Sequence, residues 1–285
     1  MTMYIRTLTA VSALSLIGGA ALAQDGGPHM GYALANDGMT LVSMADISAP
    51  TDVQTMDLSE ALDAIAWRPV TGELLGFKNG MVVTIDTASG EMTDLEAAFN
   101  DDAMVADGSK VAFDFNNKID AVRAVSSGED NLVYFPADFS DAEKAGKVVR
   151  VTDLAYAEGD ANAGADPMIF ANAYTNAING QTAESTFQYA LDAETDALVS
   201  LANNDGTLET IAEITVDGEA ADLSDWGGFD IMSPAEGEDM AYAILQMEGA
   251  ENAGFYTINL ETGEATMEAD LGMGGFTALA IAQGR

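Results

Sequence analysis

The chain contains no cysteine and only one histidine, His29, among its 285 residues. Without cysteine it can form no disulfide, no thiolate zinc site and no thiol nucleophile. A serine-type triad or a histidine-rich zinc site needs an imidazole that the fold holds in place. His29 follows Gly26-Gly-Pro28 close to the start of the chain, where segments are commonly poorly ordered. Both kinds of site are therefore excluded, and stability must come from burial and backbone pairing.

Basic residues are also scarce: 10 Lys and Arg stand against 47 Asp and Glu, a formal net charge of −37. Such a surface repels nucleic acid and anionic lipid, because both carry negative charge themselves. It serves either to attract cations or basic partners, or to keep the protein soluble in a salty environment, where charges are screened beyond about 8 Å. The acidic residues are spread along the chain instead of forming one block, which favours solubility.

Only one long apolar run is present, at the start of the chain. Arg6 precedes an apolar or small run from Leu8 to Leu22, and Ala21-Leu-Ala23 is a pattern that signal peptidase accepts. The run is too short and too rich in Gly, Ser and Ala for a membrane span, which needs about 20 apolar residues; an uncleaved anchor is the alternative. We expect export to the periplasm or the exterior, cleavage after Ala23, no membrane insertion, and a monomer. The chain then divides into residues 1–23 (signal peptide, removed), residues 24–30 (flexible N-terminus) and residues 31–285 (a single domain).

Helical periodicity is nearly absent, and short alternating runs punctuated by Gly, Asn and Asp predict an all-β protein. The clearest unit, residues 62–97, contains four expected strands: residues 62–67, 73–77, 81–86 and 91–95. Its turns contain Asn79-Gly80 and end at Gly90, where glycine supplies the positive φ that hairpins require.

This unit recurs along the chain. Residues 254–266 repeat residues 81–93 almost position for position. Gly228-Phe-Asp-Ile231 and Ala112-Phe-Asp-Phe115 match each other and stand where Ala64-Ile-Ala-Trp67 opens the first unit. Repeats of about 40–50 residues with four strands each predict a β-propeller.

The repeat count predicts five blades. Four blades open near Leu62, Lys110, Ile169 and Gly227, and the chain ends form the fifth. Residues 31–58 hold three strands and residues 275–281 hold one, so pairing of the N- and C-terminal strands completes a blade and closes the ring. A count of six blades is the alternative if residues 154–177 contain further strands. A β-sandwich or a solenoid is the alternative architecture.

Several segments resemble the DUF4394 family of exported bacterial proteins. The residues that carry the resemblance are Ile119-Asp-Ala-Val-Arg-Ala-Val-Ser126, Gly159-Asp-Ala-Asn-Ala-Gly164, Ala173-Tyr-Thr-Asn176, Asn204-Asp-Gly-Thr-Leu208, Gly228-Phe-Asp230 and Phe255-Tyr-Thr-Ile-Asn-Leu-Glu-Thr-Gly263. The likeness spans about residues 31–281, and its motifs occur in the expected order. The chain departs from it at Glu129-Asp-Asn131 and in the acidic insertion 138–147. The resemblance implies a propeller-like repeat fold and no particular activity, since the family is one of unknown function.

The opening strands of propeller blades line the central channel, which makes their polar residues candidates for ligand binding. These candidates are Asp114, Asn116, Thr175, Asn176 and Asp230. Their oxygen atoms suit Ca²⁺, the one cofactor that the sequence suggests, or a polar small molecule. Alternatively they hydrogen-bond the backbone of nearby turns. Arg123 either pairs with Asp120 or another acid, or clamps an anionic ligand.

A second candidate metal site is the loop containing Asp160, Asn162 and Asp166. Its alternating oxygen donors resemble a calcium loop, but the twelfth position is Ala171 where such a loop has a bidentate Glu. An ordinary Asx-rich loop is the alternative.

These observations favour an exported, non-catalytic propeller that binds a small molecule or a protein at a channel mouth. A calcium-dependent hydrolase or lactonase with a channel metal is one alternative, and a surface or matrix interaction module is another. Convergence of Asp114, Asn176 and Asp230 would favour the hydrolase, whereas dispersed acids beside an apolar groove would favour the other two. Trp67 and Trp226 lie near blade openings, where packing between blades accounts for them.

Overall fold

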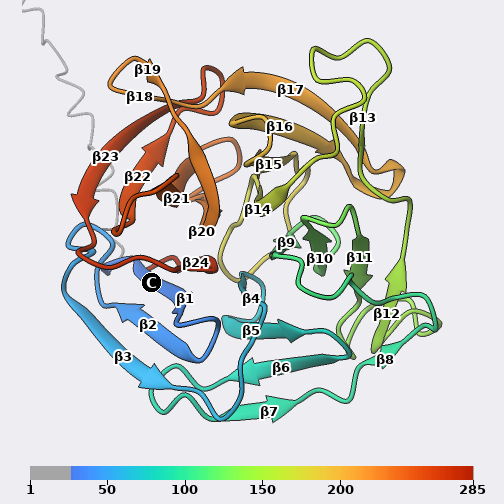
Figure 1. Cartoon of the computed structure of the whole chain (residues 1–285). Coiled ribbons are helices and arrows are strands. Elements are labelled where there is room, and N and C mark those ends of the chain that lie inside the picture. The colour runs from blue at the N-terminus through green and yellow to red at the C-terminus, as the bar shows by residue number, and fades with distance from the viewer. Residues whose placement is uncertain (1–26, 285) are drawn as a thin grey trace, which may run out of the picture.

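The computed structural model describes residues 27–284. These residues form five small, mainly antiparallel sheets arranged in a ring (Figure 1). The protein is therefore a five-bladed β-propeller, as the repeat count predicted. The predicted signal peptide and residues 24–26 lie outside the described part. Among residues 27–284, no helix has the length and apolar character that a membrane crossing requires.

The first two blades have four strands each. Blade 1 consists of β24 (Ala278–Ala282), β1 (Met30–Ala35), β2 (Thr40–Met44) and β3 (Val53–Asp57), from the centre outwards. Blade 2 consists of β4 (Ala64–Arg68), β5 (Glu73–Lys78), β6 (Met81–Ile85) and β7 (Met92–Asp94).

The other three blades carry extra outer strands. Blade 3 consists of β9 (Val111–Asn116), β10 (Ala121–Ser126), β11 (Asn131–Tyr134), β12 (Lys147–Arg150) and β8 (Ala98–Phe99). Blade 4 consists of β14 (Ile169–Tyr174), β15 (Gln188–Asp192), β16 (Ala197–Ala202), β17 (Thr207–Glu213) and β13 (Ala155–Tyr156). Blade 5 consists of β20 (Leu223–Met232), β21 (Met240–Met247), β22 (Gly254–Ile258), β23 (Glu264–Asp270), β18 (Thr215–Val216) and β19 (Glu219–Ala220).

The ring closes by pairing of the two chain ends. Strand β24 is antiparallel to β1, with Tyr32 opposite Ala280, so the last strand of the chain is the innermost strand of blade 1. His29 continues this contact: its Nδ1 accepts a hydrogen bond from the N–H of Gly284 at 3.0 Å. The segment from His29 onward thus contacts the C-terminal end.

The sequence repeat corresponds to a repeated turn. In blade 2 the N–H of Gly90 donates to the carbonyl of Asp86, and in blade 5 the N–H of Gly263 donates to the carbonyl of Asn259. Both glycines have φ near +70°, a conformation that costs glycine little. The Asp86 and Asn259 side chains each accept two further backbone N–H groups within the turn. The same local hydrogen bonds therefore set the outer hairpin of both blades.

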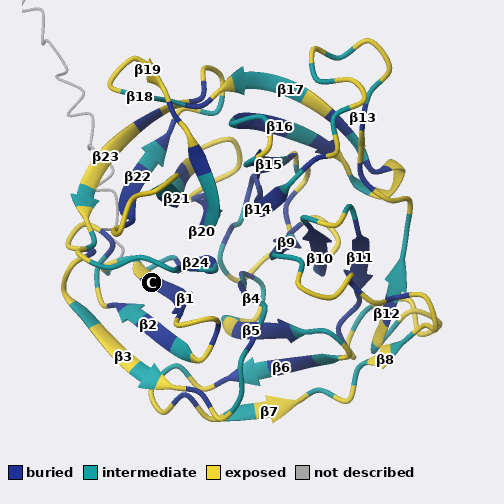
Figure 2. Cartoon of the chain, in the orientation of Figure 1, coloured by how far each residue is buried: buried dark blue, intermediate teal, exposed yellow. Residues whose placement is uncertain are grey.

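Each boundary between neighbouring blades holds one apolar cluster. Alternate residues of an inner strand face opposite neighbours; Leu34 packs towards blade 2, for example, and Ala33 towards blade 5. Both faces of the inner strands are consequently buried, while β3, β7 and β23 at the rim are largely exposed (Figure 2). The core is a ring of five interfaces around the axis.

Candidate functional site

Asp114 and Asp230 occupy matching positions on the inner strands β9 and β20, as the sequence match between their segments predicted. Each spans to the neighbouring blade: Asp114 accepts the N–H of Tyr174 on β14 at 2.7 Å, and Asp230 accepts the N–H of Ile281 on β24. An inner strand has an unpaired edge towards the axis, and these carboxylates pair N–H groups on that edge. Both side chains are almost fully buried, with 6% and 5% exposure.

The surroundings of these two carboxyls disfavour their charged forms. Burial raises the pKa of Asp230 to about 7, against the opposing effect of hydrogen bonds from the N–H groups of Ile281 and Ile231. Burial and the nearby charge of Asp230 raise the pKa of Asp114 well above its usual value. Two close carboxylates in a low-dielectric interior resist double ionisation, so the pair retains a proton near neutral pH.

The space on the axis is small. A cavity of about 10 Å³ lies between the inner strands of all five blades, and its lining includes Asn172 and Thr277. Asn172 is 2% exposed, and neither of its side-chain polar atoms has a partner; the Thr277 hydroxyl is also buried and unpaired. A cavity of this volume accommodates one water molecule, which both donates and accepts. The channel interior itself has no room for an organic ligand.

The end of the channel where the inner strands finish is called the distal mouth, and the 175–187 segment crosses it. This segment joins β14 to β15 and bonds to each of the other four blades. Its bonds run from Asn179 Nδ2 to the Gln283 carbonyl, from Gly180 N–H to the Pro69 carbonyl, from Ala183 N–H to the Asn117 carbonyl, and from Asn176 N–H to Asp239 Oδ1. The segment therefore covers the distal mouth.

Thr175 and Asn176 belong to this cover. The Thr175 hydroxyl accepts the N–H of Phe187 at 2.8 Å, and Asn176 donates to Glu236 and accepts the N–H of Gly237. The third polar candidate, Asn116, accepts hydrogen bonds from the N–H of Lys118 and the hydroxyl of Thr186. Asp114, Asn176 and Asp230 thus do not meet at one point, and only the two aspartates lie close to each other.

Arg123 is buried, with 4% exposure, and it forms no ion pair within residues 27–284. Its guanidinium donates to the Tyr174 hydroxyl at 2.9 Å, to Asn204 Oδ1 at 2.9 Å, and to Asn131 Oδ1 and the Asn203 carbonyl. Asp120, the partner considered from the sequence, instead binds Arg68, which also contacts Asp138. In this arrangement Arg123 joins blades 3 and 4.

In the loop before β14, Asp160 and Asn162 bind the protein itself. Asp160 accepts the N–H and the hydroxyl of Thr210 at 2.8 and 2.7 Å, and Asn162 Nδ2 donates to the same hydroxyl. Asp166 takes no part in these bonds. Within residues 27–284, no group of three or more His, Asp or Glu side chains is positioned to hold a metal ion. The geometry of Asp160 and Asn162 is that of an Asx-rich loop anchored to β17.

A hollow of about 400 Å³, here called the distal hollow, lies beside the cover of the distal mouth, between blades 1 and 2. Its lining combines Met30, Trp67 and Ala282 with Asn179 and Gln283, and with the glycine and proline residues 27, 28 and 284. Trp67 stacks on Tyr32, with ring centroids 6.0 Å apart and planes 14° apart. Neither Trp67 Nε1 nor Gln283 Oε1, both buried, has a hydrogen-bond partner in the described chain. No ionisable side chain of residues 27–284 lines this hollow.

Residues 39–281 match the model of a family described as a domain of unknown function, DUF4394. The chain belongs to the DUF4394 family. The match covers most of the sequence, as the resemblance implied, and it includes every polar candidate residue considered above. No curated protein matches the chain.

Several solved structures are similar to this DUF4394 chain at low identity. A protein of unknown function from Bacteroides caccae is 8% identical, with a TM-score of 0.42, over 89% of this chain and 98% of that one. An auxiliary nutrient binding protein from Bacteroides thetaiotaomicron is 13% identical, with a TM-score of 0.42, over 74% of this chain and 55% of that one. The Cps50 (Swd1) β-propeller domain from Myceliophteria thermophila is 13% identical, with a TM-score of 0.37, over 80% of this chain and 65% of that one. Likeness at this level carries nothing about the ligand.

The sequence did not point to the distal hollow in this DUF4394 chain. Trp67 was assigned to packing between blades, and it does pack against the apolar cluster between blades 1 and 2 and stack on Tyr32, but it also lines the hollow. One signal was present: Trp67 stands near the end of an inner strand, where the matching strands of blades 3 and 5 have Phe115 and Ile231. The hollow also needs residues 27, 28, 30, 179 and 282–284, which no sequence motif connects.

Proposed function

We propose that this protein is an exported, non-catalytic binding propeller, and that it binds an uncharged small molecule in the distal hollow. The observation that carries the proposal is an apolar hollow of about 400 Å³, without ionisable lining among the described residues, in a chain of net charge −37. Ligand sites are typically apolar clefts of about 300–1,000 Å³ that contain a few positioned polar groups.

The polar groups of the distal hollow define the chemistry of the ligand. Trp67 and Gln283 both line the hollow, and the N–H of Trp67 and the amide oxygen of Gln283 are buried just beneath its surface without a hydrogen-bond partner. Leaving a buried polar group unpaired costs about 1–3 kcal/mol. A planar molecule with an acceptor near Trp67 and a donor near Gln283 would recover part of that cost once the two side chains turn towards the hollow. We therefore expect a neutral heteroaromatic compound or an amide, and a charged ligand would lose its hydration without gaining a counter-charge.

The proposed location of the protein is the periplasm or the exterior, after cleavage behind Ala23. The basis is the sequence of residues 1–23, and the mature chain then acts as a monomer. The dispersed acidic surface keeps such a protein soluble and away from anionic partners. The calcium-dependent hydrolase is less well supported, because Asp114 and Asp230 use their oxygen atoms for backbone N–H groups and Asn176 lies in the cover of the distal mouth.

Tryptophan fluorescence tests this function directly, because the chain has only two Trp residues. In mature protein carrying Trp226→Phe, Trp67 is the sole indole reporter. Titration with neutral heteroaromatic and amide compounds should produce a saturable change in Trp67 emission and a rise in Tm. Charged analogues of the same compounds should have weaker effects.

The matched control is Trp67→Phe, which keeps a ring but removes the N–H donor. The Tm rise caused by the best compound should shrink in that variant, while the unliganded variant still melts cooperatively. If no neutral compound changes Trp67 emission, or if charged analogues bind as tightly as neutral ones, the proposal is wrong.

A further inference from the structure

The opposite end of the channel, where the inner strands begin, is called the proximal mouth. It contains a second hollow of about 200 Å³, the proximal hollow, lined by Asp37, Leu62, Asp63, residues 108–111 and Thr277. The proximal hollow draws on blades 1, 2 and 3 and on the residue before β24. In contrast to the distal hollow, its lining carries charges of both signs.

Lys110 is the basic residue of the proximal hollow. It is half-buried at the start of β9, and its ammonium lies 3.1 Å from the ring centroid of Trp226 in blade 5. Within the described chain, no carboxylate oxygen lies within 4.0 Å of Lys110 Nζ. Burial lowers the pKa of Lys110, while the charges of Asp225 and Asp37 oppose that effect. The ammonium therefore has an aromatic partner but no anionic one.

Asp63 is the acidic counterpart of Lys110 in the proximal hollow, and it has no basic partner among residues 27–284. One carboxylate oxygen accepts the N–H of Asn79 at 3.0 Å, and no Lys or Arg of residues 27–284 pairs with it. Burial raises the pKa of Asp63 against this hydrogen bond and the more distant charge of Lys78. The proximal hollow thus holds a cation and an anion, neither of which forms an ion pair within residues 27–284.

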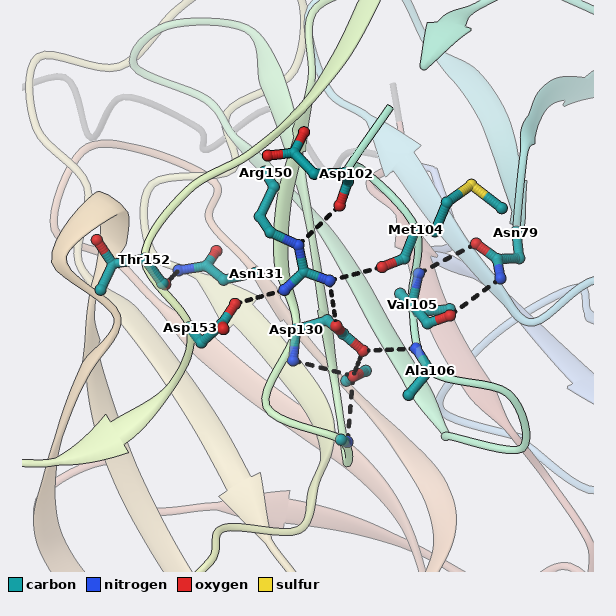
Figure 3. Close-up of polar contacts among 12 residues, drawn as sticks. Asn79, Asp102, Met104, Val105, Ala106, Asp130, Asn131, Arg150, Thr152 and Asp153 are labelled. Carbon is teal, nitrogen blue, oxygen red and sulfur yellow. Dashed lines mark hydrogen bonds and ion pairs between the residues drawn. The ribbon is translucent and has the colours of Figure 1, made fainter. Parts of the chain in front are cut away.

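A hydrogen-bond network holds residues 102–106, the segment that precedes the lining residues 108–111 of the proximal hollow (Figure 3). Arg150 on β12 binds Asp130 and Asp153 and donates to the carbonyls of Asp102 and Met104 at 2.8 and 2.7 Å. These bonds fix the segment that leads into residues 108–110.

Asn79 ties the other wall to the same segment. Its side chain exchanges two hydrogen bonds with the backbone of Val105, at 3.0 and 3.1 Å (Figure 3). The N–H of Asn79 donates to Asp63. Asp130 also accepts the N–H of Ala106 at 2.8 Å. Asp63 is held by the N–H of Asn79, and the backbone of Lys110 is held by the Ser127 hydroxyl, which accepts the N–H of Lys110 at 2.9 Å. Groups that are positioned before a ligand arrives lower the ordering cost of binding.

We propose that the proximal hollow binds a small zwitterion, an α-amino acid with a short side chain, between Lys110 and Asp63. The ligand carboxylate pairs with the ammonium of Lys110, and the ligand ammonium pairs with Asp63 and the neighbouring Asp37. A hollow of about 200 Å³ has room for a small amino acid. This site is separate from the distal hollow and does not depend on the proposed function.

Ligands of a single charge fit the proximal hollow less well. A simple anion would meet Lys110 but would also meet the negative charges of Asp37, Asp63 and Asp225. A simple cation would be attracted by those carboxylates and repelled by Lys110. A molecule that carries both charges neutralises Lys110 and the carboxylates at the same time. The attraction between opposite charges a few ångströms apart is strongest where water is partly excluded.

The test uses mature protein carrying Trp67→Phe, in which Trp226 reports on the proximal mouth alone. Glycine, L-alanine and L-serine are titrated up to about 10 mM, against acetate and methylammonium as the two half-ligands. The amino acids should change Trp226 emission with saturation, and each half-ligand should bind at least about tenfold more weakly, a loss of about 1.4 kcal/mol. Wild-type mature protein, followed by the Tm rise with the same compounds, provides a readout without any substitution.

Single substitutions test whether Lys110 and Asp63 each bind one charged group of the ligand. Lys110→Met and Asp63→Asn should each weaken glycine binding at least about tenfold, while exposed Lys118→Met and Asp52→Asn should leave it unchanged. Acetate or methylammonium binding as tightly as glycine would overturn the proposal, and so would the absence of any response to the three amino acids in emission and Tm. Because the distal hollow is monitored through Trp67 and the proximal hollow through Trp226, a negative result at one site says nothing against the other.

Discussion

Asp114 and Asp230 show how a single residue type acts at the propeller axis. Each closes a gap in backbone pairing by accepting an N–H from the next inner strand. As a consequence, two carboxyl groups lie close together in a site with little water, and this environment raises the pKa of both. Their role is therefore structural, and it links the stability of the ring to pH.

The stability of the protein should fall as pH rises through neutrality. The pKa of Asp230 is about 7 in the folded protein and about 3.9 in an unfolded chain. A raised folded-state pKa gives stability that is complete below about pH 4 and is lost as pH rises through about 7. The unfolding free energy should decline by on the order of 1 kcal/mol per pH unit over that window. Denaturant melts at closely spaced pH values measure this slope.

The Asp230→Asn variant isolates the contribution of this carboxyl. It should flatten the slope between about pH 4 and 7, although it lowers stability at acid pH because an amide accepts only one of the two N–H groups. Asp52→Asn, at an exposed site, should keep the wild-type slope. An unchanged slope in Asp230→Asn would show that the axial carboxyls ionise normally.

At the scale of elements, Arg123 connects strands that the chain itself does not join. From β10 it reaches Asn131 on β11, Tyr174 on β14 and the turn at Asn203 and Asn204, so one guanidinium fastens blade 3 to blade 4. All these partners are neutral, and burial raises the pKa of Tyr174 to about 12, which keeps that hydroxyl protonated.

Replacement of Arg123 by Lys should destabilise the protein despite retaining the charge. A lysine ammonium cannot reproduce the planar fork and leaves several buried acceptors unpaired. We expect a loss of roughly 2–4 kcal/mol in unfolding free energy, measured by urea melts. Lys118→Arg, on the exposed β9–β10 turn, is the control and should have a negligible effect. A comparably small effect in Arg123→Lys would mean that the contacts of Arg123 contribute little to holding blades 3 and 4 together.

At the scale of the whole molecule, charge opposes the fold. A net charge of −37 repels itself more strongly in the compact state than in the unfolded chain. Five apolar interfaces between blades and the pairing of β24 with β1 counter this repulsion. Because the acidic side chains are spread over the chain, the repulsion is long-ranged and should respond to ionic strength.

The Tm of the mature protein should therefore rise by several degrees between about 0.01 M and 1 M NaCl, where the Debye length falls from about 30 Å to 3 Å. KCl at equal ionic strength should give the same rise. A larger rise with CaCl₂ at matched ionic strength would instead indicate a specific calcium site, and a Tm independent of NaCl would mean that self-repulsion is unimportant.

The propeller was readable from the sequence because its determinants are local and repeated. The sequence signals were the alternation of apolar residues, glycine at the positive-φ positions of Gly90 and Gly263, and a lone opening strand predicted at residues 275–281, which is β24 in the structure. Each of these signals acts within one blade or one turn. The outermost strands β8, β13, β18 and β19 were not predicted. They are only two residues long, and β8, β13 and β18 pair in parallel with distant segments, so no local pattern marks them.

The sequence by itself thus determined the blades, their number and the closure of the ring. The tertiary structure alone decided which blade each inner side chain faces, that Asp114 lies near Asp230, and that residues 175–187 cover the distal mouth. It also decided that Trp67 and Lys110 line hollows at opposite mouths. Each of these features brings together residues from different blades, and their proximity depends on how the sheets twist and pack around the axis, which local sequence patterns do not encode.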